Sequence, residues 1–210
     1  MPTPPSPAPQ TPAAPDTVAA SATPTPACTA LTPPPLPCVI DVEASGFGRG
    51  SYPIEVGVVL EDGQAWCSLV RPAPDWTHWD EQAERLHGLS RPLLSRHGRP
   101  AREVALALNH HLRGRAVHTD AWAHDYPWLA RLFDEAGLLP AFRLHHLHAL
   151  FTPEQAAGWD DAVAQARVAL GPMRHRASND ARVLQHAAAL LLGLTPVVPR
   201  GAALSRRRDD

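Results

Sequence analysis

The sequence predicts an α/β fold with a mixed five-stranded sheet flanked by helices. Three short apolar segments come first, at 38–44, 54–60 and 65–70, and two more, at 115–119 and 142–146, alternate with helical patterns. Strands joined by short turns pair antiparallel, whereas strands reached through a helix are usually parallel. The order therefore indicates a three-strand meander to which later strands are added through helices.

Helical patterns follow the meander. Apolar side chains recur at helix spacing in five segments: 79–87, 101–113, 126–136, 153–169 and 179–192. Gly88, Gly114 and Gly137 stand directly after the first three of them, where glycine commonly ends a helix. No internal repeat interrupts this order, so we expect one folded domain over 38–195.

The first 37 residues differ in composition from the rest. They hold 13 of the 24 prolines and a single charged side chain, Asp16. Such a segment cannot bury enough apolar surface to offset its ordering entropy, so we expect a disordered tail with polyproline-II character. It could be a solubilising extension or could recruit a proline-binding partner. Residues 196–210 are expected to be a frayed C-terminal tail.

Composition limits the cellular setting more than the function. The N-terminal segment lacks the basic start and apolar run of a secretory signal, and no segment approaches transmembrane length. Three cysteines without a CxxC pair argue against a zinc site or a disulfide framework. We therefore expect a cytoplasmic protein without membrane association. The net charge of −2 neither supports nor excludes a nucleic-acid partner, although all positive charge is Arg.

Two carboxylates interrupt the first predicted strand, Asp41 and Glu43. Side chains alternate along a strand, so both project from the same face. Burying ionised carboxylates is costly without a positive partner. The strand holds no Arg and the chain no Lys, so a divalent cation is the natural partner. The Gly-containing turn at 45–48 lets a ligand approach the backbone at the end of this strand.

A second group of chemically active residues lies near the C-terminus. His175 is predicted on the loop before the last helix, and Asp180 in that helix's first turn, capped by Ser178 or Asn179. Both side chains can point at one spot. Taken alone, the pair also fits a simpler interpretation, in which Asp180 stabilises the first helical turn through the macrodipole and His175 is an ordinary loop histidine.

Together these motifs resemble the DEDDh 3′–5′ exonucleases, the family of ribonuclease T, oligoribonuclease and the proofreading subunits of DNA polymerases. The resemblance spans about residues 38–193. Its parts occur in the family's order: DVEASGF at 41–47, PIEVGV at 53–58, LHGLS at 86–90, and His175 with Asp180. Several matches in one order are more specific than any one of them.

The middle motif fits least well. The family has an Asp at the start of the helix after the fourth strand, often preceded by His-Asn and a Phe. Asp125 matches best, because Trp128 and Leu129 follow it where the family's helix buries its apolar face. Asp120 is the alternative ligand. It stands where the family commonly has Asn, and His124 replaces the Phe.

The resemblance implies a ribonuclease H-like fold and a site for two Mg²⁺ or Mn²⁺ ions. The residues that would hold them are Asp41, Glu43, Asp125 and Asp180. Paired divalent ions can offset the charge that develops when a phosphodiester is cleaved, and hard oxygen ligands suit these metals. By the same resemblance His175 is the general base, because imidazole can take up a proton near neutral pH.

The resemblance also implies how the 3′ end of a strand would be held. Backbone N–H groups near Ala44 would meet the terminal sugar, Phe47 would stack on or beside the last base, and His87 would line the same cleft. The expected partners are 3′ ends of single-stranded DNA or RNA, without a readable preference, and the resemblance permits a homodimer. The expected function is a metal-dependent 3′–5′ exonuclease. The alternative is a non-catalytic nuclease-fold module that binds nucleic acid or a protein partner.

Overall fold

The computed structural model describes residues 35–196. The tails were predicted at 1–37 and 196–210, and all but residues 35–37 and 196 of them lie outside the described residues, so the proposed domain boundaries stay predictions. Within the described part, folded structure begins slightly before residue 38. Leu36 is buried, and the carbonyl of Pro37 accepts a hydrogen bond from Nε2 of Gln185, 2.8 Å away.

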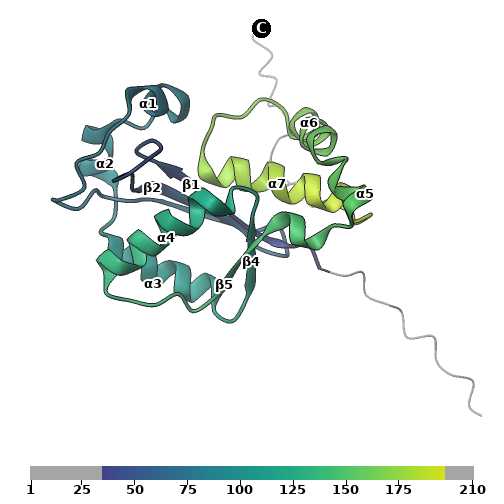
Figure 1. The fold of residues 1–210 in the computed structure, drawn as a ribbon, viewed down its shortest axis with the longest axis horizontal. Helices are drawn as coiled ribbons and strands as arrows, with labels where there is room; N and C mark the ends of the chain where they lie inside the picture. Colours follow the sequence, from purple (N-terminus) through teal and green to yellow (C-terminus); the bar gives the residue numbers. More distant parts are fainter. Residues whose placement is uncertain (1–34, 197–210) are drawn as a thin grey trace, which may run out of the picture. The chain divides into compact units, whose positions relative to one another are not determined.

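The predicted mixed sheet of five strands is confirmed (Figure 1). The strands are β1 (Cys38–Ala44), β2 (Pro53–Val59), β3 (Ala65–Leu69), β4 (Ala116–Thr119) and β5 (Arg143–His146). Their order in the sheet is β3-β2-β1-β4-β5. The meander β1-β2-β3 is antiparallel, whereas β4 runs parallel to β1 and β5 parallel to β4. The predicted three-strand meander, with later strands added through helices, is therefore correct.

Helices cover both faces of the sheet. They are α1 (Glu81–His87), α2 (Arg91–His97), α3 (Ala101–Leu112), α4 (Trp122–Ala136), α5 (Pro153–Ala156), α6 (Trp159–Leu170) and α7 (Ala177–Leu191), with a 3₁₀ helix, η1, at Leu147–Leu150. Helices α3 and α4 pack together on one side of the strands, and α7 lies along β1 and β2 on the other, with α6 against it (Figure 1). Within the described residues no helix is long and apolar enough to span a bilayer.

Alternation along β1 divides its side chains between two apolar cores. Ile40 and Val42 belong to the core beneath α3 and α4, whereas Val39 packs with α6 and α7. Because Asp41 and Glu43 are in phase with Val39, their carboxylates lie on the α7 face. The sheet therefore presents both acids to the N-terminal end of the last helix.

Gly57 allows α7 to approach the sheet closely. It pairs with Asp41 in the β1–β2 register. A Cβ atom at Gly57 would lie 2.1 Å from the backbone nitrogen of Ser178 and 2.2 Å from the carbonyl carbon of Ala177. Only a residue without a side chain fits here, and the contact sets how far the first turn of α7 stands from β1.

Three helical segments differ from the prediction. The single helix expected over 153–169 is two helices: a capping box of Thr152 and Gln155 starts the short α5, and the chain turns at Gly158 before α6 begins. Helix α4 starts at Trp122, four residues before the expected start, with Pro127 inside it. Helix α2 was not predicted; Ser90 caps it and Pro92 stands in its first turn.

The expected cap of the last helix was wrong. Neither Ser178 nor Asn179 is the N-cap, because α7 begins at Ala177 with Arg176 in the cap position. The Asp180 side chain accepts the Arg176 backbone N–H at 3.2 Å, and Asn179 donates its side-chain amide to the carbonyl of Arg174. The carboxylate of Asp180 thus takes over the role expected of a neutral cap.

Candidate active site

Three carboxylates meet where β1 faces the first turn of α7. Single oxygen atoms of Asp41, Glu43 and Asp180 all lie within 4.8 Å of one another. The first two come from one face of β1 and the third from a helix 137 positions further along the chain, held near by the close packing at Gly57. Sequence reasoning brought these three together, and the structure places them side by side.

Asp125 approaches the same place from α4. Its side chain is 1% exposed, and it lines a cleft of about 380 Å³ together with Asp41 and Glu43. The hydroxyl of Thr119, at the end of β4, donates a hydrogen bond to Oδ2 of Asp125. Asp120, the alternative, is half-buried and is not among the residues that line this cleft. The geometry therefore favours Asp125 as the fourth acid of the group.

The four acids disturb one another's ionisation. Burial, followed by the charges of Asp125, Glu43 and Asp180, raises the pKa of Asp41 well above its usual range. Burial, with the charge of Asp180 next, raises the pKa of Glu43 to about 7. The pKa of Asp125 is also raised to about 7, mainly by burial, although the Thr119 hydrogen bond opposes this. The protein alone does not neutralise this group.

A divalent cation fits the chemistry of these donors. Carboxylate oxygens are hard ligands that suit Mg²⁺ or Mn²⁺, and a bound cation would remove the mutual repulsion that raises the pKa values. Among the residues that line the cleft there is no Arg to serve instead. Asp41, Glu43 and Asp180 would hold such an ion, with Asp125 the nearest further ligand.

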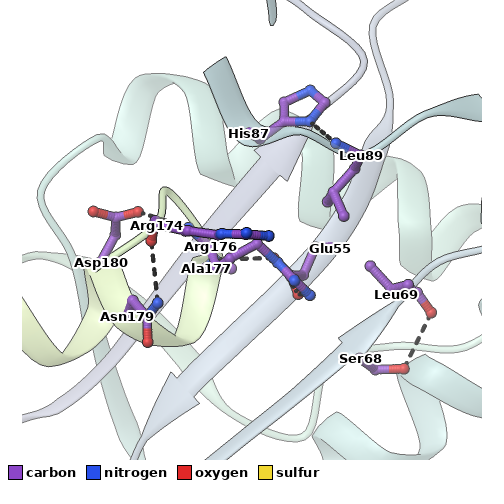
Figure 2. Close-up of polar contacts among 10 residues, drawn as sticks. All are labelled: Glu55, Ser68, Leu69, His87, Leu89, Arg174, Arg176, Ala177, Asn179 and Asp180. Atoms are coloured by element: carbon purple, nitrogen blue, oxygen red, sulfur yellow. Dashed lines mark hydrogen bonds and ion pairs between the residues drawn. The ribbon is translucent and has the colours of Figure 1, made fainter. Parts of the chain in front are cut away.

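A partly buried ion pair fixes the position of Asp180. Glu55 on β2 is 1% exposed, and its carboxylate accepts hydrogen bonds from Nε of Arg176, at 2.8 Å, and from the backbone N–H of Ala177, at 3.1 Å (Figure 2). The same Arg176 donates its own backbone N–H to Asp180. The sheet thus holds the first residues of α7 through one carboxylate.

His175 precedes this anchored turn. Its side chain is 46% exposed, and its Nδ1 lies 3.8 Å from Oδ2 of Asp180. The structure therefore brings the predicted histidine beside one predicted ligand, at the rim of the group. His175 is not among the residues that line the cleft itself.

The three predicted substrate-contacting residues all line the cleft. Ala44 ends β1, where the pairing register with β2 shifts. Phe47 is 66% exposed, and its ring lies edge-on to His124 with centroids 5.1 Å apart. His87 is buried at the end of α1.

His87 has a defined tautomer. The backbone N–H of Leu89 donates to its Nδ1 at 3.0 Å, so the ring proton of the neutral form is on Nε2 (Figure 2). Burial lowers the pKa of this imidazole. Nε2 is buried and has no hydrogen-bond partner among the described residues. A donor thus stands unused in the wall of the cleft.

Comparison with known proteins identifies the fold. No protein-family model and no curated protein sequence matches the chain. Among solved structures, E. coli exonuclease I in complex with a 5cy-dT13 oligonucleotide is similar at a TM-score of 0.56 and 15% identity, over 74% of this chain and 40% of that one. The chain has the fold of exonuclease I. The predicted α/β fold class, and the fold that the family resemblance implied, are thereby confirmed.

Two further structures give the same result. E. coli exonuclease I with a dA16 oligonucleotide has a TM-score of 0.57 at 14% identity, over 74% of this chain and 40% of that one. The moderately thermophilic exonuclease I from Methylocaldum szegediense has a TM-score of 0.54 at 15% identity, over 74% and 39%. The chain thus spans about two fifths of the exonuclease I chains that it matches.

Sequence reasoning missed the residues that support the candidate site from behind. Glu55 lies within the PIEVGV segment at 53–58 but was assigned no role of its own, and neither were Arg176 and Thr119. A charged side chain inside an otherwise apolar strand is itself a signal, because it needs a partner when buried. That signal could have identified Glu55, although nothing local in the sequence names Arg176.

Proposed function

We propose that this protein is a metal-dependent 3′–5′ exonuclease acting on single-stranded or short nucleic acid. The convergence of Asp41, Glu43 and Asp180 within 4.8 Å, at the edge of a cleft that also contains Asp125, is the observation that supports it most. The similar structures support the substrate class, since they include exonuclease I in complex with oligonucleotides and a zinc-bound form of its complex with single-stranded DNA.

The four acids share one task in this proposal. Asp41, Glu43, Asp125 and Asp180 would hold two Mg²⁺ or Mn²⁺ ions. Divalent cations, when bound, supply the positive charge that offsets the charge building up on the attacked phosphate and the leaving oxygen. Thr119 orients Asp125 by its hydrogen bond, and the Glu55–Arg176 pair orients Asp180.

His175 is the general base. Its Nδ1 faces Asp180 at 3.8 Å, which leaves Nε2 to take the proton of the attacking water. The exposed position of the His175 ring lets it move toward the cluster of three carboxylates when substrate is present. Because only the neutral imidazole accepts a proton, activity should rise from acid to mildly alkaline pH.

The terminal nucleoside lies in the cleft. Phe47, exposed above it, offers its ring to the last base, and Nε2 of buried His87 donates to a sugar or phosphate oxygen. A polar donor left without a partner is costly, so the substrate oxygen replaces an interaction that the free protein lacks. This arrangement recognises a chain end by shape and one hydrogen bond, which suits DNA and RNA alike.

The experiment is cleavage of 5′-labelled DNA and RNA oligonucleotides with Mn²⁺, with Mg²⁺ and with EDTA. The expected result is a ladder that shortens from the 3′ end, needs the cation and disappears in Asp41→Asn. Thermal unfolding and Mn²⁺ titration of the same samples separate loss of chemistry from loss of folding. A folded protein that binds Mn²⁺ and oligonucleotide but leaves both polymers intact would instead be a non-catalytic nuclease-fold module.

A further inference from the structure

A second hollow adjoins the candidate site on the far side of Asp180. It lies between α6 and α7, has a volume of about 350 Å³, and is lined by Arg167, Val168, Pro172, Met173, Arg174 and Asp180, among others. We call it the α6–α7 hollow. Asp180 belongs both to this hollow and to the cluster of three carboxylates, so a ligand that spans the two would pass over that residue.

The cleft and the α6–α7 hollow differ in the charge of the side chains that line them. The cleft is lined by Asp41, Glu43, Asp80 and Asp125 and by no Arg, whereas the α6–α7 hollow has two guanidinium groups beside one carboxylate. A nucleic-acid strand has one negative charge per nucleotide, and phosphates that do not contact a cation would be repelled by the acids of the cleft. The cleft alone can therefore accept a chain end but not the strand behind it.

Most guanidinium groups near the site are already engaged. Arg176 is paired with Glu55, Arg131 donates to the carbonyls of Gly50 and Ser51, and Arg91 donates to the carbonyls of Trp76 and Thr77. Rearranging any of them would break contacts that hold the fold. They are poor candidates for binding a strand that must slide after each cleavage.

Arg167 and Arg174 donate no side-chain hydrogen bond within the described residues. The Arg167 side chain is 54% exposed and forms only a loose ion pair with Asp180, in which Nη2 lies 3.8 Å from Oδ1, beyond hydrogen-bond distance. Arg174 is exposed, and Asn179 holds its backbone by donating to its carbonyl. Guanidinium groups bind phosphate with paired N–H donors. The apolar side chains of Val168, Pro172 and Met173 give the hollow a surface on which a base can rest.

We propose that the α6–α7 hollow binds the phosphodiester of the nucleotides preceding the scissile bond, through Arg167 and Arg174. This rests on the proposed function and adds a direction to it. The terminal nucleoside occupies the cleft, and the scissile phosphate lies at the cluster of three carboxylates. The rest of the strand leaves over Asp180 along the α6–α7 loop. Strand binding is then separate from the residues that carry out the cleavage.

The first test is length dependence. Cleavage of 5′-labelled oligo-dT and oligo-U of two to six nucleotides is measured for wild type, Arg167→Gln/Arg174→Gln and two single-charge controls. In wild type kcat/KM rises as the substrate lengthens beyond two nucleotides, and in the double variant that rise is lost. Arg96→Gln, in an exposed residue of α2 that lines neither hollow, keeps the rise. Arg49→Gln tests whether the strand instead leaves the cleft over the turn that carries Phe47.

The second test needs no cleavage. Affinity for a phosphorothioate dT6 is measured over a range of salt concentrations in EDTA. Each lost phosphate contact lowers the slope of log affinity against log salt by about 0.7 for a single strand, so the double variant should lose about 1.4. If wild type cleaves nothing, the proposed function fails while this slope still tests the hollow. An unchanged slope and length dependence in the double variant, or their loss in Arg49→Gln instead, would overturn the proposal.

Discussion

Glu55 and Arg176 form a partly buried ion pair between residues 121 positions apart in the chain. Glu55 stands directly opposite Glu43 in the β1–β2 register, so two carboxylates adjoin on neighbouring strands. Arg176 neutralises the buried one, and its charge also counteracts the rise in the pKa of Glu43. The two acids therefore have different roles. Glu55 accepts hydrogen bonds from Arg176 and Ala177 and anchors α7, while Glu43 remains available to a cation.

Breaking this pair should destabilise the fold strongly. Arg176→Met leaves the Glu55 carboxylate buried without its counter-charge, and we expect a loss of about 3 kcal/mol in the free energy of unfolding, measured with urea. Glu55→Gln/Arg176→Met should recover part of the loss, because the neutral amide oxygen can still accept the Ala177 N–H. Equal stability of Arg176→Met and the surface variant Arg96→Met would contradict this account.

Gly57→Ala should damage the site through packing alone. The added methyl group would meet the Ala177 and Ser178 backbone at 2.1–2.6 Å, so the first turn of α7 must move away from β1. We expect a cost of about 2 kcal/mol or more and weaker Mn²⁺ binding, because Asp180 moves with the turn. Gly158→Ala is the matched control. There the methyl group meets Leu191 at an ordinary 3.4 Å, and stability should change by less than about 0.5 kcal/mol.

The parts of the site that sequence predicts are those set by local periodicity. Alternation along a strand placed Asp41 and Glu43 on one face, and position at the start of a helix placed Asp180 near them. What holds these residues in position is not local. Nothing near Gly57 indicates that a helix 120 residues later packs on it, and Glu55 selects Arg176 only after the chain has folded. The misplaced cap of α7 has the same origin, because Glu55 binds the Ala177 N–H and starts the helix there.

Asp125 and Asp120 should respond differently to neutralisation. Asp125→Asn removes a charge from the wall of the cleft, and we expect cleavage of a labelled oligonucleotide to fall by more than about 100-fold, because losing even an outer partner of a metal site costs about 10–100-fold. Asp120→Asn should cost less than about 10-fold. Thr119→Val, which removes the hydrogen bond to Asp125, should lie between them. A larger effect of Asp120→Asn would reverse the assignment of the middle acid.

The cation-free protein should lose stability as pH rises to and through neutrality. The folded pKa values of Glu43 and Asp125, about 7, exceed those of the unfolded chain, so the folded state binds more protons between about pH 4 and 7. Stability from these groups therefore falls as pH rises through that window, and the raised pKa of Asp41 acts in the same direction. Buried histidines with lowered pKa values, such as His87, act in the opposite sense below about pH 6.5.

Thermal unfolding from pH 6.5 to 8 isolates the effect of the acids. In EDTA we expect Tm to drop by a few degrees across this range, whereas saturating Mn²⁺ should remove the drop because the ion replaces the protons. Asp41→Asn should flatten the EDTA profile by removing one of the repelling charges. A Tm that is constant or rises over this range in EDTA would mean that the carboxylates do not repel one another as their positions indicate.

Phe47 should contribute to substrate binding without contributing to stability. Its ring is two-thirds exposed and contacts His124 edge-on, so Phe47→Ala should leave Tm nearly unchanged. Stacking of one base on an aromatic ring is worth about 1–3 kcal/mol, so we expect KM for a short oligonucleotide to rise by about 10-fold or more at similar kcat. Leu139→Ala, at an even more exposed apolar side chain outside the cleft, is the control and should change neither parameter. A fall in Tm with unchanged KM would instead identify Phe47 as a packing residue of the turn, and the stacking surface for the terminal base would then have to come from His124 or Trp128.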